Sequence, residues 1–184
     1  MKLLGAVLAG GLSSRFGSDK ALARIDESSL IERAVETLEA QCDAVRVVGR
    51  ELAPSPVVKD WPRAGLGPLG GVAGAMHYAR DHGFAEILTV AVDIPDLHSD
   101  LANQLGPAPA FVRDQPVVGR WRSADLELLS ELFAGEGKYA MRRFADMCGA
   151  RPVTLDRPLA NINTEQDLHD YLEARSIAAE GTRE

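Results

Sequence analysis

The sequence predicts an α/β fold, a three-layer αβα sandwich around a mostly parallel, Rossmann-like sheet. Apolar runs alternate along the chain with segments whose apolar residues recur at helical spacing, as in repeated strand and helix units. Two of these runs are apolar almost throughout, which is typical of strands buried on both faces of a parallel sheet. With 184 residues, 46% of them hydrophobic, the chain has the size and composition of one globular domain. We expect that domain over residues 1–175 and a flexible tail over 176–184.

The elements are predicted in order from periodicity, caps and turn residues. The first strand, residues 3–8, is interrupted only by Gly5. Ser29 and Glu32 have the spacing of a capping box at the start of a helix that reaches about residue 41. Further strands are expected at 44–48, 56–59 and 86–92, twice within 110–121, and at 151–155. Further helices are expected at 69–82, at 98–105, after Ser123, at 138–147 and after an N-cap at Thr164.

Charge and cysteine content exclude several classes of protein. The net charge of −7 argues against a general binder of nucleic acid or membrane surfaces, which usually carries a basic footprint. The two cysteines, Cys42 and Cys148, belong to no C-x-x-C or Cys/His cluster, so neither a disulfide framework nor a zinc site is indicated. No apolar run approaches the roughly 20 residues of a membrane span, and the N-terminus lacks the pattern of a cleaved leader. We therefore expect a cytoplasmic protein.

A glycine- and serine-rich loop follows the first strand and has the features of a phosphate-binding loop. Gly10 and Gly11 let the backbone turn so that successive N–H groups can point at an anion. Arg15 and Lys20 add a planar guanidinium and a compact ammonium. Neither a Walker loop nor a dinucleotide fingerprint has this spacing. The alternative for the loop is a plain strand-to-helix turn with two solvated cations.

Three further segments place polar groups or glycines beside predicted strand ends. Asp60 precedes a glycine-rich stretch, residues 65–71, where the backbone approaches either a ligand or another element closely. For Gly74, inside the next helix, tight packing on the sheet is the better explanation. Asp93 directly follows an apolar strand, at the edge where open α/β sheets bind ligands, although a lone Asp there is often only a turn residue. Asn161 and Asn163, before the last helix, also fit an ordinary turn.

These segments together resemble the molybdenum cofactor guanylyltransferase family. The string LAGGLSSRFGSDKA resembles the family loop L-A-G-G-x-S-S-R-M-G-x-D-K-A, with Phe16 at the usual Met. GPLGG is similar to G-P-L-A-G, VDIPDL to C-D-x-P-x-L, and NINTEQDL to N-x-N-T-P-E-D-L, with Glu165 at the usual Pro. Four motifs in the family's order span the chain, which is far more specific than any one of them. Gln115 stands where family members commonly have His.

The resemblance implies a nucleotidyltransferase that moves GMP from GTP to molybdopterin and releases pyrophosphate, with Mg²⁺ as cofactor and molybdoenzyme apoproteins or their chaperones as further partners. It implies Arg15, Lys20 and Asp93 as catalytic residues and Asp93 with Asn163 as metal ligands. For substrate binding it implies Asn161, Asn163 and Gln115. The implied nucleotide-binding residues are Leu8, Ala9, Gly10, Gly11, Lys20, Asp60, Gly67, Pro68, Leu69, Gly70 and Asp93.

The residues fit this chemistry on independent grounds. A phosphate nucleophile is already ionised at neutral pH, so the absence of a Ser/His/Asp set is no objection. The reaction needs neutralisation of the triphosphate and alignment of the attacking and leaving oxygens. Asp60 could accept both N–H donors of a guanine edge, or it could contact the ribose. Two alternatives stay open: a related cytidylyl- or sugar-phosphate nucleotidyltransferase, and a nucleotide-binding module without turnover, to which Gln115 and Phe16 point.

Overall fold

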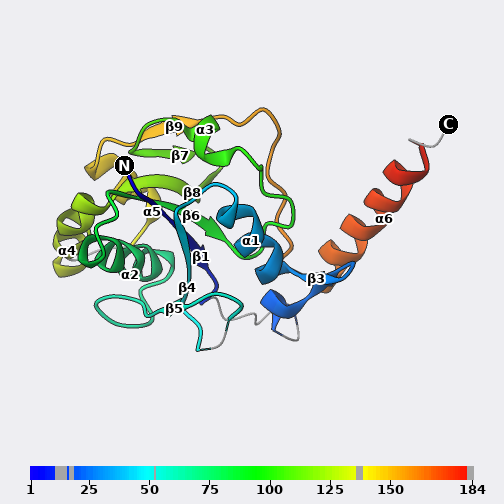
Figure 1. The fold of residues 1–184 in the computed structure, drawn as a ribbon, viewed down its shortest axis with the longest axis horizontal. Coiled ribbons are helices and arrows are strands. Elements are labelled where there is room, and N and C mark those ends of the chain that lie inside the picture. Colours follow the sequence, from blue (N-terminus) through cyan, green and yellow to red (C-terminus); the bar gives the residue numbers. More distant parts are fainter. Residues whose placement is uncertain (11–15, 17–18, 52, 136–138, 182–184) are drawn as a thin grey trace.

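The computed structural model describes residues 1–10, 16, 19–51, 53–135 and 139–181 (Figure 1). Across these residues the main sheet has seven strands in the order β5-β4-β1-β6-β8-β7-β9. β8 is antiparallel to both of its neighbours, and the other pairs are parallel. The predicted mostly parallel sheet is therefore confirmed. The strands are β1 (Leu3–Leu8), β4 (Ala44–Val48), β5 (Val57–Val58), β6 (Glu86–Ala91), β7 (Ala110–Val112), β8 (Gln115–Arg122) and β9 (Arg151–Val153).

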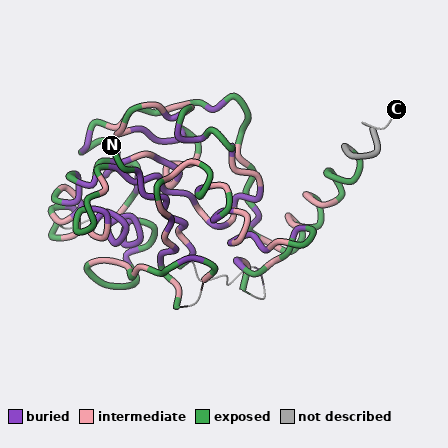
Figure 2. Tube along the Cα trace, in the orientation of Figure 1, coloured by how far each residue is buried: buried purple, intermediate pink, exposed green. Residues whose placement is uncertain are grey.

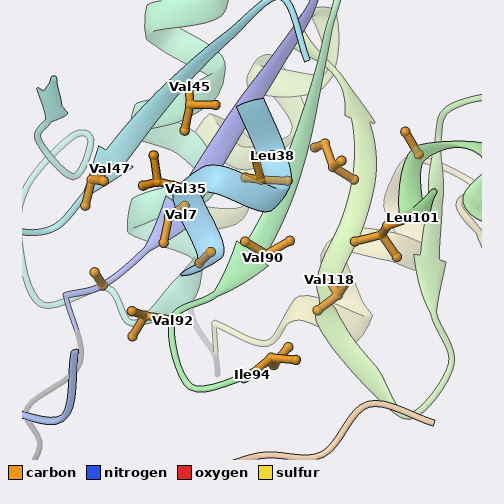
Figure 3. Packing of buried hydrophobic residues seen from close by; sticks show 14 of the residues in the cluster. Val7, Val35, Leu38, Val45, Val47, Val90, Val92, Ile94, Leu101 and Val118 are labelled. Atoms are coloured by element: carbon orange, nitrogen blue, oxygen red, sulfur yellow. The ribbon is translucent and has the colours of Figure 1, made fainter. Parts of the chain in front are cut away.

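Helices cover both faces of the sheet and complete the predicted three layers. One face carries α1 (Leu30–Glu39) and α3 (Leu101–Leu105), and the other carries α2 (Pro68–Asp81), α4 (Leu126–Ala134) and α5 (Met141–Met147). Each pair of layers encloses its own hydrophobic cluster. Figure 3 shows the first cluster, where Val35 and Leu38 of α1 lie over valines of the sheet.

β1 shows why nearly every residue of a central strand is apolar. Leu4 and Ala6 belong to the cluster under α2, whereas Leu3 and Val7 belong to the cluster under α1. The side chains of a strand alternate between faces, so both faces here are buried. Gly5 is part of the same packing, because a Cβ there would lie 3.1 Å from Leu38.

Local sequence signals explain several element boundaries. The capping box is confirmed: the Ser29 hydroxyl accepts the Glu32 N–H, and the Glu32 carboxylate accepts the Ser29 N–H at 2.7 Å. The Thr164 cap is also confirmed, since its hydroxyl accepts the Asp167 N–H at 3.1 Å. The prediction that Ser123 caps a helix is wrong. Ser123 begins a 3-10 turn, η2 (Ser123–Asp125), and its hydroxyl donates to the Ala85 carbonyl at 3.1 Å.

Other predicted ranges are shortened. The helix expected at 98–105 begins only at Leu101, because buried His98 lies in the preceding turn, where its carbonyl accepts the Leu101 N–H. The prediction that Gly74 allows tight packing of its helix is confirmed, since a Cβ there would lie 2.2 Å from the Lys59 carbonyl oxygen. α2 therefore packs directly on the backbone that leads to Asp60.

The last helix, α6 (Glu165–Gly181), projects from the body of the molecule (Figures 1 and 2). It continues through residues 176–181, so this part of the expected tail is helical, and its flexibility stays a prediction. The domain boundary at residue 175 stays a prediction. The start of α6 lies near a short hairpin, β2 (Arg24–Ile25) and β3 (Ser28–Ser29), which periodicity did not predict.

No helix in the described part of the chain combines the length and the apolar character needed to cross a membrane.

Candidate functional site

A cleft of about 700 Å³ opens where β1, β4 and β6 end, at the edge predicted from the strand order. Its walls come from the loop after β1, the start of α2, the turn after β6, the start of β8 and the segment before α6. Among the described residues, the cleft is lined by Leu8, Ala9, Gly10, Asp19, Lys20, Ala21, Val48, Asp60, Gly65, Gly67, Pro68, Gly71, Ala91, Val92, Asp93, Asp114, Gln115, Pro116, Val117 and Asn161.

Lys20, Asp93 and Asn163 meet at one end of this cleft. The Lys20 ammonium lies 3.1 Å from Asp93 Oδ2 and donates to Asn163 Oδ1 at 3.4 Å. The Asp93 backbone carbonyl accepts the Ile162 N–H at 2.8 Å, which fixes the segment before α6 to the turn after β6. Three residues that sequence motifs single out separately thus lie together in the fold. We call this set the charged end of the cleft.

The charged end has the donor set for a hard divalent cation. Asp93 Oδ1 is buried and has no hydrogen-bond partner among the described residues. An unpartnered carboxylate oxygen in such a place is costly unless a cation or another donor meets it. Carboxylate and amide oxygens are ligands that Mg²⁺ accepts, and Mg²⁺ usually takes only one or two of them beside phosphate and water. The described residues contain no cluster of three or more His, Cys, Asp or Glu that could hold a metal.

The loop that carries Lys20 is anchored by an ion pair. Asp19 accepts the Ala21 N–H at 3.2 Å, and this bond caps the 3-10 turn η1 (Lys20–Leu22). Both terminal nitrogens of Arg50 donate to the same carboxylate, one of them at 2.9 Å. The hydrogen bonds from Arg50 lower the pKa of Asp19. Arg50 has no motif of its own, so sequence reasoning missed it.

Two glycines let the loops after β1 and β4 touch. A Cβ on Gly49 would lie 2.6 Å from the Gly10 Cα, and Gly49 has a φ of 84°. Positive φ and a contact this close both require glycine. The loop after β1 is therefore held against the loop after β4 by backbone contact and by the pair of Asp19 with Arg50.

Another part of the cleft wall is built from backbone and one carboxylate, and we call it the glycine end. Asp60 lies against Gly49, Gly70 and Gly71, whose Cβ positions would be 3.5 to 3.8 Å from its oxygens. Burial raises the pKa of the Asp60 carboxyl. Gly67 is the N-cap of α2 with a φ of 62°, and Gly67, Pro68 and Gly71 at the start of that helix line the cleft.

Most predicted nucleotide-binding residues line the cleft, but Leu69 and Gly70 do not. Leu69 is fully buried in the cluster between α2 and the sheet, so its side chain serves packing. Gly70 is buried behind Asp60, and its carbonyl accepts the Trp61 N–H at 3.0 Å. Their assignment as nucleotide-binding residues stays a prediction. Gly11 and Arg15 lie outside the described residues.

Gln115 and Asn161 form a side wall of the cleft. The Gln115 amide donates to the Leu159 carbonyl at 2.9 Å and to Asn161 Oδ1. With its oxygen engaged, the Asn161 side chain presents its two N–H donors as the remaining polar group. Asp114 and Pro116, beside Gln115, also line the cleft and lacked a sequence signal strong enough to identify them.

A model of the family described as MobA-like NTP transferase domain matches residues 5–158. The chain belongs to this family. A molybdenum cofactor guanylyltransferase of Acidiphilium cryptum, strain JF-5, is 34% identical over 180 residues, which cover 90% of this chain and 92% of the relative. The family assignment makes the protein a nucleotidyltransferase.

Solved structures agree with this family at the level of the fold. The molybdopterin-guanine dinucleotide biosynthesis protein A of Archaeoglobus fulgidus superposes with a TM-score of 0.76 at 18% identity, covering 94% of this chain and 98% of that one. A manganese complex of a Mycobacterium tuberculosis protein superposes with a TM-score of 0.62 at 18% identity, covering 94% and 97% of the two chains. A protein of the same fold has thus been crystallised as a manganese complex.

Proposed function

We propose that the protein transfers GMP from GTP to molybdopterin, forming molybdopterin guanine dinucleotide and pyrophosphate. The observation that carries the proposal is the convergence of Lys20, Asp93 and Asn163 at the cleft that Asp60 also lines. The names of the relatives supply the substrates, and this arrangement supports a nucleotide lying between the two ends.

In the proposed complex the guanine lies at the glycine end and the triphosphate reaches the charged end. The Asp60 carboxylate accepts the two N–H donors of the guanine edge, and the backbone around Gly67 faces the nucleotide. Lys20 meets the phosphates as a point charge. We assign the same task to Arg15, which belongs to the loop outside the described residues.

Asp93 and Asn163 are the residues that would hold Mg²⁺. When bound there, Mg²⁺ neutralises charge on phosphate oxygens and helps to align the reacting groups. Asp93 Oδ1 fits this role, because it is buried and has no hydrogen-bond partner in the described part of the chain, and a cation would stabilise such an oxygen.

The reaction forms a bond between an oxygen of the molybdopterin phosphate and the α-phosphorus of GTP, and breaks the bond from that phosphorus to the bridging oxygen. The leaving pyrophosphate takes the electron pair, and no proton transfer is needed because the nucleophile is already ionised. Asn161, Asn163 and Gln115 line or border the remaining side of the cleft, and we propose that they orient the acceptor. The Asn161 N–H donors suit phosphate or carbonyl oxygens.

We propose the cytoplasm as its location and molybdoenzyme apoproteins or their chaperones as recipients of the product. Cys42 and Cys148 are both free thiols, in keeping with a reducing compartment. Burial raises the pKa of Cys42 to about 12 and that of Cys148 to about 11, so neither thiol is reactive near neutral pH.

The test is release of pyrophosphate by the purified protein with molybdopterin, Mg²⁺ and each nucleoside triphosphate in turn. We expect release with GTP only, and only when molybdopterin is present. Release with CTP in place of GTP would make the protein a cytidylyltransferase. GTP binding without release would leave a nucleotide-binding module and overturn the proposal.

A further inference from the structure

α6 is tied to the turn after β6 by a network of polar side chains. The Tyr171 hydroxyl donates to Asp96 Oδ2 at 2.5 Å. Arg33 of α1 donates to Asp96 Oδ1 at 3.1 Å and to the Pro95 carbonyl at 3.1 Å. Arg175 donates to the Tyr171 oxygen at 3.1 Å from the next turn of α6. Asp96 lies three residues after Asp93, so the network holds the same turn that carries the proposed metal ligand.

The same part of α6 also contributes to a small hydrophobic cluster separate from the two main ones. We call it the satellite core. It unites the loop after β1, the β2–β3 hairpin, the start of α1, the residue between the two asparagines, and α6. Its buried members are Phe16, Ile25, Leu30 and Ile162, and Leu168, Tyr171 and Leu172 pack against them.

Two hydrogen bonds from backbone N–H groups hold the segment around Asn163, one to the turn after β6 and one to the first turn of α6. On one side the Ile162 N–H donates to the Asp93 carbonyl at 2.8 Å. On the other side the Asn163 N–H donates to Asp167 Oδ2 at 2.8 Å, in the first turn of α6. The place of Asn163 relative to Asp93 therefore depends on where the start of α6 docks.

We propose that Tyr171 and Asp96 are positioning residues, whose hydrogen bond docks α6 so that Asn163 Oδ1 lies beside Asp93 as the second oxygen for the cation. Beyond Tyr171, α6 is exposed from residue 173 to residue 177 and projects outward (Figure 2). In this stretch Arg175 also pairs with Asp26 of the β2–β3 turn at 3.1 Å and lies 3.8 Å from Asp96 Oδ1. The inference rests on the metal pair of the proposed function.

The chemistry of the hydrogen bond between Tyr171 and Asp96 suits a contact that stays formed at neutral pH. Burial and the hydrogen bond to Asp96 raise the pKa of Tyr171, so the phenol keeps its proton at neutral pH and always donates. Arg33 holds the other oxygen of Asp96, which leaves Oδ2 directed at Tyr171. A hydrogen bond to a charged acceptor is among the stronger ones, and its loss is expected to weaken what it positions by about tenfold.

The test is the dissociation constant of Mn²⁺, measured by electron paramagnetic resonance on the full chain saturated with a non-hydrolysable GTP analogue. Tyr171→Phe keeps the ring in the satellite core and removes only the hydroxyl. We expect it to raise the Mn²⁺ dissociation constant by about tenfold. Glu173→Gln is the matched control on the same helix. Glu173 pairs only with His169 among the described contacts, so its variant should bind Mn²⁺ like the wild type.

A double-mutant cycle with Asn163→Ala decides whether Tyr171 acts through Asn163. If it does, adding Tyr171→Phe to Asn163→Ala causes no further loss of Mn²⁺ affinity. Additive losses, or wild-type affinity in Tyr171→Phe, would overturn the positioning role. Asp93→Asn separates this failure from failure of the proposed function. If Asp93→Asn also binds Mn²⁺ normally, the metal pair itself is wrong, whereas loss of binding there with normal Tyr171→Phe rejects only the positioning role.

Discussion

The two ends of the cleft are built on different principles. At the charged end, side chains from segments far apart in the sequence contact one another, and the satellite core and α6 support them from behind. At the glycine end, backbone and a single carboxylate face the cleft, and burial alone accounts for the raised pKa of Asp60.

This difference follows from what each end is proposed to bind. Phosphates and a cation need full charges held at fixed distances, so the charged side chains at this end form ion pairs and hydrogen bonds with one another. A planar base needs close backbone approach and a few unpaired acceptors or donors, which small residues provide. Changes at the charged end should therefore affect turnover most, and changes at the glycine end should affect nucleotide choice and stability.

The largest effect is expected at Asp93. Asp93→Asn keeps the shape of the side chain and removes the anionic ligand, so turnover should fall by about a hundredfold or more. Pyrophosphate release at limiting Mg²⁺ measures it. Asp114→Asn is the control, because Asp114 also lines the cleft but lies in the exposed β7–β8 turn. A near-normal rate for Asp93→Asn would remove the main support for a metal at the charged end.

Lys20→Met should change two measurements in opposite directions. Without the ammonium, turnover of GTP is expected to fall by about a hundredfold. Mn²⁺ binding without nucleotide should instead tighten by about fivefold, because the ammonium, 3.1 Å from Asp93 Oδ2, no longer competes for that oxygen. Lys59→Met, an exposed lysine next to Asp60, should change neither. Weaker nucleotide-free Mn²⁺ binding in Lys20→Met would show that the ammonium does not compete with the cation.

A smaller effect, on affinity and base choice, is expected at the glycine end. Asp60→Ala should raise the GTP dissociation constant by roughly 5- to 150-fold, because guanine donors lose their acceptor. The preference for GTP over ATP should fall as well, as competition binding can show. Equal weakening of GTP, ATP and CTP would assign Asp60 to the ribose, and no weakening would make it a turn residue.

The smallest effect is on stability and depends on pH. Burial raises the pKa of Asp60 above its ordinary value of 3.8, so the folded state keeps this proton longer than the unfolded state. The free energy of unfolding therefore falls as the pH rises from 3.8 through the raised pKa. The amide of the Asp60→Asn variant does not ionise, so its free energy of unfolding does not fall in this way. The Tm of Asp60→Asn at pH 7 should therefore lie slightly above that of the wild type.

Thermal melts of Asp60→Asn and wild type from pH 7 downward check the sign. The difference should shrink as the pH falls through the raised pKa and vanish well below 3.8, where Asp60 is protonated in both states. A difference that is constant with pH, or that grows toward low pH, would contradict the assignment of the shift to Asp60.

The sequence predicted the layers, β1, β6 and the caps, because these depend on local periodicity and on side chains within one helical turn. From strand-end positions and the order of the motifs, it also predicted that Lys20, Asp93 and Asn163 lie in one site. It did not predict the pairs of Asp19 with Arg50 or of Tyr171 with Asp96. Polar residues that satisfy each other across distant loops leave no periodic pattern. The buried position of the Leu69 side chain was not predicted, because a short motif contains both cleft residues and core residues.

The contact between Gly10 and Gly49 has a consequence for how the protein can vary. Because backbone meets backbone there, a side chain added at Gly49 would have to displace a neighbouring strand end. The closest approach of these two loops is therefore set by main chain, and the pair of Asp19 with Arg50 adds to it. In a saturation mutagenesis library we expect both positions to tolerate almost no substitution. Variation in the width of the cleft beside these two loops must then come from insertions or from shifts of whole strands.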